Sequence, residues 1–171
     1  QVDGTYEGQP LRKAKQTEVL FSEFTSNNYS WASDFKGKDF HIELTRFIAN
    51  AEESFVEEAG GEDYLKIVES SGGEGHEHYL KAGTTQELHG LLISLNKPTE
   101  GAINLQITPE GSYISSPYLG SYMTMTDQKV FTVAKDSMQP LQYRCLYNIG
   151  GMRFVLPEPL KKGKMVMTSI A

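Results

Sequence analysis

The sequence has a single cysteine, Cys145, so it has no internal disulfide framework. No uninterrupted apolar run approaches the roughly 18 residues that a membrane-spanning helix needs, and we expect no membrane span. Glycine-rich phosphate loops, dinucleotide fingerprints and the G-x-S-x-G elbow of hydrolases are also absent. The fold must therefore be held by an apolar core or by partner chains, and nucleotide-binding and hydrolase-type sites have no support.

Basic residues are the minority charge, with 16 Lys and Arg against 22 Asp and Glu. Proteins that coat nucleic acids bind phosphate through clustered Lys and Arg, so we expect no nucleic-acid partner. The acidic residues are unevenly spread, because nine of them lie between Glu52 and Glu77 beside the single cation Lys66. The acidic run over 51–63 lacks the order of a calcium-binding loop and is interpreted as a solvated loop.

With 171 residues, of which 39% are hydrophobic, the chain has the size of one domain. We therefore expect a single domain over 1–171, with an irregular lead-in over 1–10 where two Gly and a Pro occur. The chain starts at Gln1 and not at Met, which is typical of a processed product or an excised fragment.

Short segments rich in β-branched and aromatic residues recur beyond residue 70, with Pro or Gly turns at spacings of about 8–14 residues. Such spacing indicates antiparallel connections, since a parallel crossover needs a dozen or more residues. The sequence thus predicts an all-β, mainly antiparallel sandwich or barrel of roughly 8–10 short strands. The predicted strands are 39–49, 64–70, 88–95, 102–108, 121–126, 129–134, 141–149, 152–156 and 164–170. Near-helical spacing of apolar residues also predicts one short helix over 11–24.

Three of the four histidines lie in the segment GGEGHEHYLKAGTTQELHG, residues 72–90. A hairpin that turns at Gly83-Thr84 would place four candidate ligands on one face, because side chains alternate along a strand and opposed residues share a face. Imidazole and carboxylate groups are ligands for Zn, Fe, Mn or Ni. The pattern therefore predicts a divalent transition-metal site made by His76, His78, Glu87 and His89.

Two other interpretations of these histidines stay open. A turn shifted by one residue, to Thr84-Thr85, would separate His78 from His89. Histidines that face each other across a hairpin also occur on ordinary solvated surfaces, without any ligand.

The H-x-H pair at His76 and His78, followed by Glu87, is similar to part of the metal-binding motif of the cupins. That resemblance implies a metalloprotein or metalloenzyme. The chain departs from the cupin motif because its glutamate comes later and because no Pro-x-Gly step with a further His follows His89. An H-x-H pair also resembles trimeric viral fibre tips, in which one pair from each of three chains surrounds a single ion.

A tyrosine-rich tract, SYISSPYLGSYMTMT at 112–126, carries Tyr113, Tyr118 and Tyr122 with several hydroxyl groups and little charge. Flat amphipathic rings are favoured in protein contacts and for stacking on sugars, so these residues are predicted to bind a protein or carbohydrate ligand. Cross-strand packing is the alternative role of such tyrosines. Cys145 is interpreted as a small buried hydrophobe, because no sequence feature supplies a base beside it.

These patterns favour a non-enzymatic binding or structural module over an enzyme. The apolar, alternating end of the chain suggests docking in a sheet or against a neighbouring subunit, so a homo-oligomer is expected. Modules of virion appendages, adhesins and extracellular recognition domains are the analogy, which favours an extracellular or virion-associated location over a cytoplasmic one. The alternative is a cupin-like metalloprotein.

Overall fold

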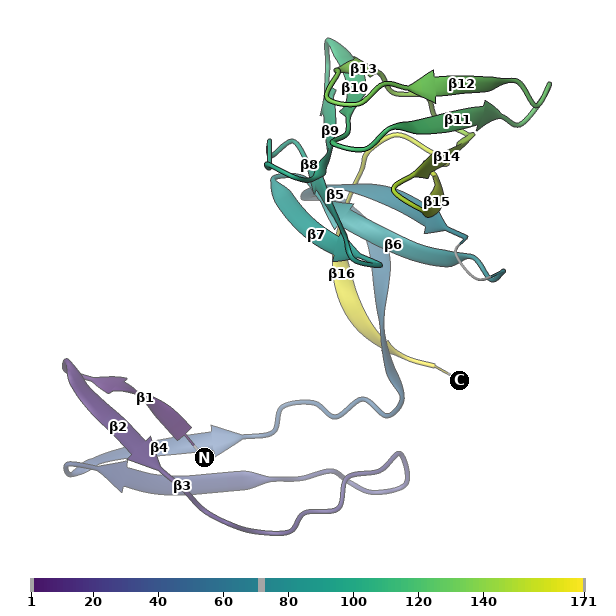
Figure 1. Ribbon diagram of the computed structural model, residues 1–171. Helices are drawn as coiled ribbons and strands as arrows, with labels where there is room; N and C mark the ends of the chain where they lie inside the picture. The colour runs from purple at the N-terminus through teal and green to yellow at the C-terminus, as the bar shows by residue number, and fades with distance from the viewer. Residues whose placement is uncertain (1, 71–72, 171) are drawn as a thin grey trace. The chain divides into compact units, whose positions relative to one another are not determined.

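The computed structural model describes residues 2–70 and 73–170, and every regular element in them is a strand (Figure 1). Most strand pairs are antiparallel, so the predicted all-β, mainly antiparallel class is confirmed. Nowhere in these residues does a helix occur that is long and apolar enough to cross a membrane.

The helix predicted over 11–24 does not form. A strand, β2 (Gln9–Lys13), occupies its start, and irregular chain and turns follow up to residue 29. The apolar residues that suggested a helical stripe have no core to cover, because Leu20 and Phe24 are 81% and 89% exposed. An isolated short helix is marginal in water without such packing.

Where one domain was expected, the chain groups into two compact units. Unit 1 comprises Gln1–Ser54 and Met167–Ala171, and unit 2 comprises Phe55–Val166.

Unit 1 contains two hairpins, one formed by β1 (Val2–Tyr6) and β2, the other by β3 (Ser30–Phe35) and β4 (Lys38–Glu43). The β3–β4 hairpin pairs Trp31 with Ile42, and the Trp31 ring meets Phe40 edge-on at 5.7 Å between centroids. None of the side chains described in this unit is buried. The described part of unit 1 therefore has hydrogen-bonded ladders and ring contacts but no buried side chain.

Unit 2 contains two sheets (Figure 1). The five-stranded sheet has the order β13-β10-β9-β8-β7 and contains β7 (Thr84–Leu88), β8 (Leu91–Leu95), β9 (Ile103–Thr108), β10 (Gly111–Ser115) and β13 (Gln139–Pro140). The seven-stranded sheet has the order β12-β11-β14-β15-β5-β16, with β6 paired to β5. Its strands are β5 (Ala51–Glu69), β6 (His76–Lys81), β11 (Gly120–Thr124), β12 (Val130–Val133), β14 (Cys145–Ile149), β15 (Met152–Val155) and β16 (Lys161–Ser169). The first residues of β5, 51–54, and the last residues of β16, 167–169, are assigned to unit 1. One pair, β8 with β9, is parallel.

Both sheets contribute to one hydrophobic core. Ile93 and Leu105 enter it from the five-stranded sheet, and Leu65, Tyr147 and Phe154 enter it from the seven-stranded sheet. All five side chains are at most 1% exposed. Residues of both sheets thus alternate between this interior and the outside, which is the packing of a sandwich.

Strand β5 is much longer than the predicted strand 64–70, because it also includes the acidic run that was interpreted as a loop. Lysines of β16 neutralise part of this run, through the ion pairs Lys161–Glu57 at 2.9 Å, Lys162–Asp63 at 3.1 Å and Lys164–Glu58 at 2.7 Å. The basic group near the end of the chain therefore complements the acidic group that precedes it, and pairing overrides the low strand propensity of the acidic residues.

Candidate metal centre

The histidine hairpin predicted from the sequence does not form. Strand β6 pairs with β5, with His78 opposite Ile67, while β7 pairs with β8. Strand β6 pairs with β5 because β5 has an apolar face. Leu65 and Ile67 lie on this face, and Leu80 of β6 is buried opposite Leu65. The short Ala82–Gly83 connection consequently passes from one sheet to the other instead of closing a hairpin.

A glutamate, Glu69, lies at the end of β5 on the face that points into the core. It follows Leu65 and Ile67 at the two-residue repeat of a strand, and its side chain is completely buried. In the register of the sheet it stands opposite Phe154 on β15 and His76 on β6. A carboxylate in these apolar surroundings needs a cation or strong hydrogen-bond donors close by.

His89 supplies one such partner from the five-stranded sheet. It occupies the two-residue turn between β7 and β8, in which His89 and Gly90 have φ values of 49° and 79°. Two positive φ values are those of a type I′ turn, which suits the twist of a hairpin. The turn projects the imidazole so that His89 Nε2 lies 2.6 Å from Glu69 Oε2, while half of the His89 side chain remains exposed.

His78, on β6, completes the cluster. One nitrogen of His78, one of His89 and a carboxylate oxygen of Glu69 all lie within 4.8 Å of one another. The His78 Nε2 atom is buried and has no hydrogen-bond partner among the described residues. Burial lowers the pKa of the His78 imidazole, Glu69 opposes that effect, and His89 and His76 add to it. The neutral imidazole that results is the form that binds a metal.

Two of the four predicted metal ligands, His78 and His89, are thus brought together, and Glu69 joins them in place of the other two. His76 is exposed and lies outside the cluster, although it stands opposite Glu69. Glu87 pairs with Leu92 and is exposed, on the opposite side of β7 from the buried Leu88. The alternation Leu65, Ile67, Glu69 was the signal for the missed ligand, because it places a carboxylate on an apolar face.

A set of two imidazoles and one carboxylate has defined chemistry. It is the donor set of several zinc and non-haem iron sites, in which three protein ligands leave coordination positions open. Calcium and magnesium prefer sites made entirely of oxygen ligands, so the two nitrogens favour a transition metal. The cluster Glu69, His78 and His89 could therefore hold a divalent transition-metal ion.

The three predicted ligand-binding tyrosines lie in different places. Tyr113 is on β10 of the five-stranded sheet, Tyr118 follows that strand and is 38% exposed, and Tyr122 is on β11 of the other sheet. The Tyr122 ring stacks on Phe131 at 5.1 Å and contacts Tyr147 at 5.5 Å. Tyr122 therefore packs against two other rings, and the three tyrosines lie on different elements of the fold.

Comparison with protein-family models, curated proteins and solved structures found no match for this chain. The fold and the site therefore define only a class: an all-β protein whose two-sheet unit carries a cluster of two histidines and a buried glutamate.

Proposed function

We propose that this chain is a non-enzymatic β-module that binds one divalent transition-metal ion through Glu69, His78 and His89. The observation that carries the proposal is the convergence of three donor atoms within 4.8 Å from two strands and a turn. A cation at their centre would lie against the buried carboxylate of Glu69 and would give His78 Nε2, which is buried, a bond.

The position of the cluster favours a structural role for the ion. Glu69 and His78 belong to the seven-stranded sheet, and His89 belongs to the turn at the edge of the five-stranded sheet. An ion bound to all three would link the two sheets, much as a disulfide links two strands. This chain has a single cysteine and cannot form such a link within itself.

An ion held by Glu69, His78 and His89 would keep coordination positions open, as sites with three protein ligands do. The open coordination positions would then be filled by water or by a further protein ligand, for which His76 is the nearest candidate in the register.

The direct test is metal stoichiometry on the full chain without an affinity tag. We expect isothermal titration with Zn²⁺ to give one ion per chain, and Co²⁺ to give the visible absorption of a site with nitrogen ligands. The variants His78→Ala and Glu69→Gln should each lose this binding. His41→Ala is the matched control, because His41 is an exposed histidine on β4 of unit 1.

Three outcomes would contradict the proposal. Zn²⁺ binding that does not saturate, or that His41→Ala weakens as much as His78→Ala does, would show only adventitious histidine binding. One ion per three chains, lost on replacing His76 and His78 but not Glu69, would favour the fibre-type arrangement. Zn²⁺-dependent turnover of any substrate would show that the chain is an enzyme and would contradict the proposed non-enzymatic function.

A homo-oligomer is the second part of the proposal, supported by large apolar side chains that are exposed in the single chain. Leu119 and Val130 in unit 2 are 69% and 67% exposed, and Leu20 and Phe24 in unit 1 are more exposed still. A partner chain that covered such side chains would remove their apolar surface from water. Light scattering of the eluting protein should give a mass that is a multiple of 19.1 kDa. A mass of one chain at a protein concentration of about 100 μM would refute the proposed homo-oligomer, because this concentration is far above the Kd of most stable oligomers.

A further inference from the structure

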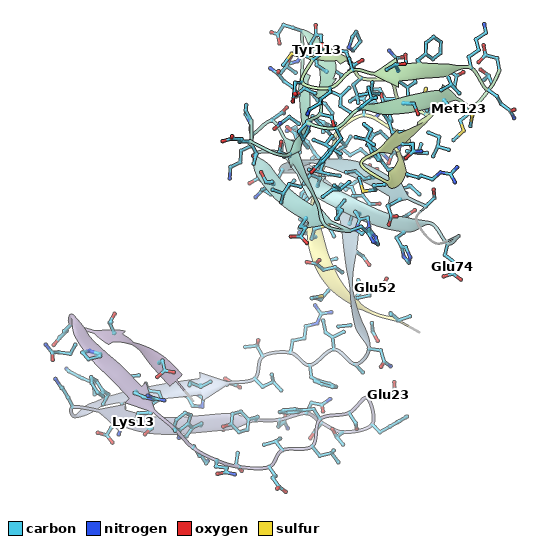
Figure 2. The ribbon with its side chains drawn as sticks, viewed as in Figure 1. Lys13, Glu23, Glu52, Glu74, Tyr113 and Met123 are labelled. Carbon is cyan, nitrogen blue, oxygen red and sulfur yellow. The ribbon has the colours of Figure 1, made fainter. Side chains whose placement is uncertain are left out.

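A second candidate site lies on the five-stranded sheet, separate from the metal cluster. A cavity of about 360 Å³ is lined by strands β9 and β10, by the loop that follows β8 and by Met138. Its size is at the small end of the range for ligand sites, which is about 300–1,000 Å³. Figure 2 shows Tyr113 on this part of unit 2.

Polar side chains of the two strands face this cavity from one side of the sheet. Leu105 and Ile114 are buried in the core, so their strand neighbours Gln106 and Tyr113 must point the other way. Gln106 and Tyr113 also stand directly opposite each other in the β9–β10 register. A planar amide and an aromatic ring thus lie next to each other at about the 5 Å separation of a cross-strand pair.

The Tyr113 ring lies beside a glycine of its own strand. A Cβ atom on Gly111 would lie only 3.0 Å from atoms of the Tyr113 side chain, so the outer end of the ring occupies space that another residue would need. An aromatic ring on the outer side of the sheet is a suitable platform for stacking.

Two amides of the cavity wall are already used for structure. Asn96 exchanges hydrogen bonds with the backbone of Ile107, and Asn104 accepts from the backbone N–H of Thr99 and donates to the carbonyl of Ala102. These hydrogen bonds fix the two asparagines in the loop beside the cavity.

Other side chains that line the cavity indicate which class of ligand it suits. Gln106 offers an amide, Tyr113 a phenol and Lys97 an ammonium group, while Pro98 and Met138 add apolar surface. No carboxylate is among the described lining residues, although the whole chain has a net charge of −6. Hydroxyl groups of a ligand would find both donors and acceptors among these side chains.

We propose that this cavity binds one unit of a neutral or weakly acidic saccharide, stacked on Tyr113 and hydrogen-bonded by Gln106 and Lys97. A sugar ring presents C–H groups on its face and hydroxyls at its rim, which matches an aromatic platform with an amide and an ammonium group beside it. A purely apolar ligand would make no use of these polar groups. The metal cluster takes no part in this site.

A glycan array probed with the labelled full chain tests the class of ligand. We expect a restricted set of bound glycans, and titration of the best one should lose at least about tenfold in affinity in Tyr113→Ala, the effect of one stacking contact. Tyr118→Ala is the matched control, because Tyr118 is an exposed tyrosine outside the lining, and its affinity should stay within about twofold of the wild type. Tyr113→Phe should keep most of the affinity, since it keeps the ring.

A second measurement covers the case in which Tyr113→Ala does not fold. Saturation-transfer NMR on the wild-type chain should show contact between the sugar C–H protons and an aromatic side chain, and the ring resonances of Tyr113 should shift on titration. No bound glycan on the array, binding only to a peptide array, or unchanged Tyr113 resonances would each overturn the proposal. Treatment with a metal chelator should leave the affinity for the glycan unchanged. The outcome of this test therefore does not depend on whether the cluster of Glu69, His78 and His89 binds a metal.

Discussion

The imidazole of His89, in a turn of one sheet, lies 2.6 Å from the carboxylate of Glu69, which is buried on a strand of the other sheet. This contact joins the two layers of unit 2 at a position where an apolar side chain would have been expected on the strand. The pair also shows an asymmetry, because the carboxylate is fully buried while the imidazole is half exposed. Of the two side chains, only that of His89 is in contact with solvent.

Metal binding should stabilise unit 2 against unfolding. At a free Zn²⁺ concentration 100 times the Kd, an ion that binds only the folded state adds about 2.7 kcal/mol to the free energy of unfolding. Urea unfolding followed by circular dichroism measures this gain. Tryptophan fluorescence is unsuitable, because the single tryptophan, Trp31, lies in unit 1.

Glu69→Gln is the informative variant for this gain, because it keeps the shape of the side chain and removes the charge. Zn²⁺ should then add less than about 0.5 kcal/mol, corresponding to a ligand concentration near or below the Kd. Mg²⁺ should not stabilise the wild type, since it binds oxygen ligands. Equal stabilisation by Mg²⁺, or an undiminished effect in Glu69→Gln, would refute the prediction.

The turn at His89 should tolerate asparagine and reject valine. Asparagine adopts positive φ readily and is common in type I′ turns, whereas a β-branched residue clashes there. With chelator present, we expect His89→Val to be less stable than His89→Asn by about 1–2 kcal/mol, the cost of the left-handed conformation. Both variants lose the imidazole, so their difference reports the turn alone. Equal stabilities would mean that the backbone at residue 89 is not held at its φ of 49°.

Much of the all-β architecture was predictable, because β-branched and aromatic residues at short spacing leave few alternatives. The error at 11–24 had a physical cause: the spacing of Leu20 and Phe24 suggests a helical stripe, but a stripe forms a helix only when there is a core to cover. The extension of β5 into the acidic run was hidden for a related reason. The lysines that stabilise it lie far along the chain, at 161–164, and no local pattern connects the two segments.

Half of the candidate site was predictable, and the rest depended on which strands pair. His78 and His89 were identified from residue type alone, but their predicted partners assumed a hairpin between 76–82 and 85–91. Strand β6 instead pairs with β5, and this choice brings in Glu69 and leaves Glu87 on the outside. Pairing between strands is a tertiary property, since it depends on which apolar faces are available.

Two neighbouring glycines of β5 should respond differently to alanine. A Cβ on Gly61 would lie within 3 Å of the backbone of Gly163 on β16, whereas a Cβ on Gly60 would meet nothing within 4 Å. We expect Gly61→Ala to lower the free energy of unfolding by about 1–3 kcal/mol, as overpacking does. Gly60→Ala should be neutral or slightly stabilising, by up to about 0.5–1 kcal/mol. Similar values for both variants in urea unfolding would contradict the close approach of β5 and β16.

The two units should differ in local stability. The side chains described in unit 1 are all at least partly exposed, while Ile93, Ile103 and Tyr147 of unit 2 are fully buried. Backbone hydrogen bonds without buried apolar contacts open easily, so amides of β1 to β4 should exchange with solvent much faster than those of β8, β9 and β14. Hydrogen exchange followed by mass spectrometry at low protein concentration measures this. Equal protection of both units would show that unit 1 is covered in solution, which would support the proposed oligomer.

Tyr147 should make unit 2 sensitive to alkaline pH. Burial raises the pKa of its phenol to about 12, although the N–H of Gln142, 2.8 Å from the hydroxyl, has the opposite effect. The unfolded phenol titrates near 10, so the folded state holds its proton more tightly. The stability that this group contributes is therefore complete below pH of about 10 and is lost as the pH rises through about 12.

The variant Tyr147→Phe separates this effect from that of the other tyrosines and lysines. At pH 7 it should be less stable than the wild type by about 1–3 kcal/mol, because the N–H of Gln142 loses its acceptor. Between pH 10 and 12 the wild type should lose stability faster than the variant, so the gap between them should narrow. Unfolding curves at several pH values measure the gap directly. A gap that stays constant up to pH 12 would mean that the Tyr147 phenol ionises equally in both states, which its complete burial forbids.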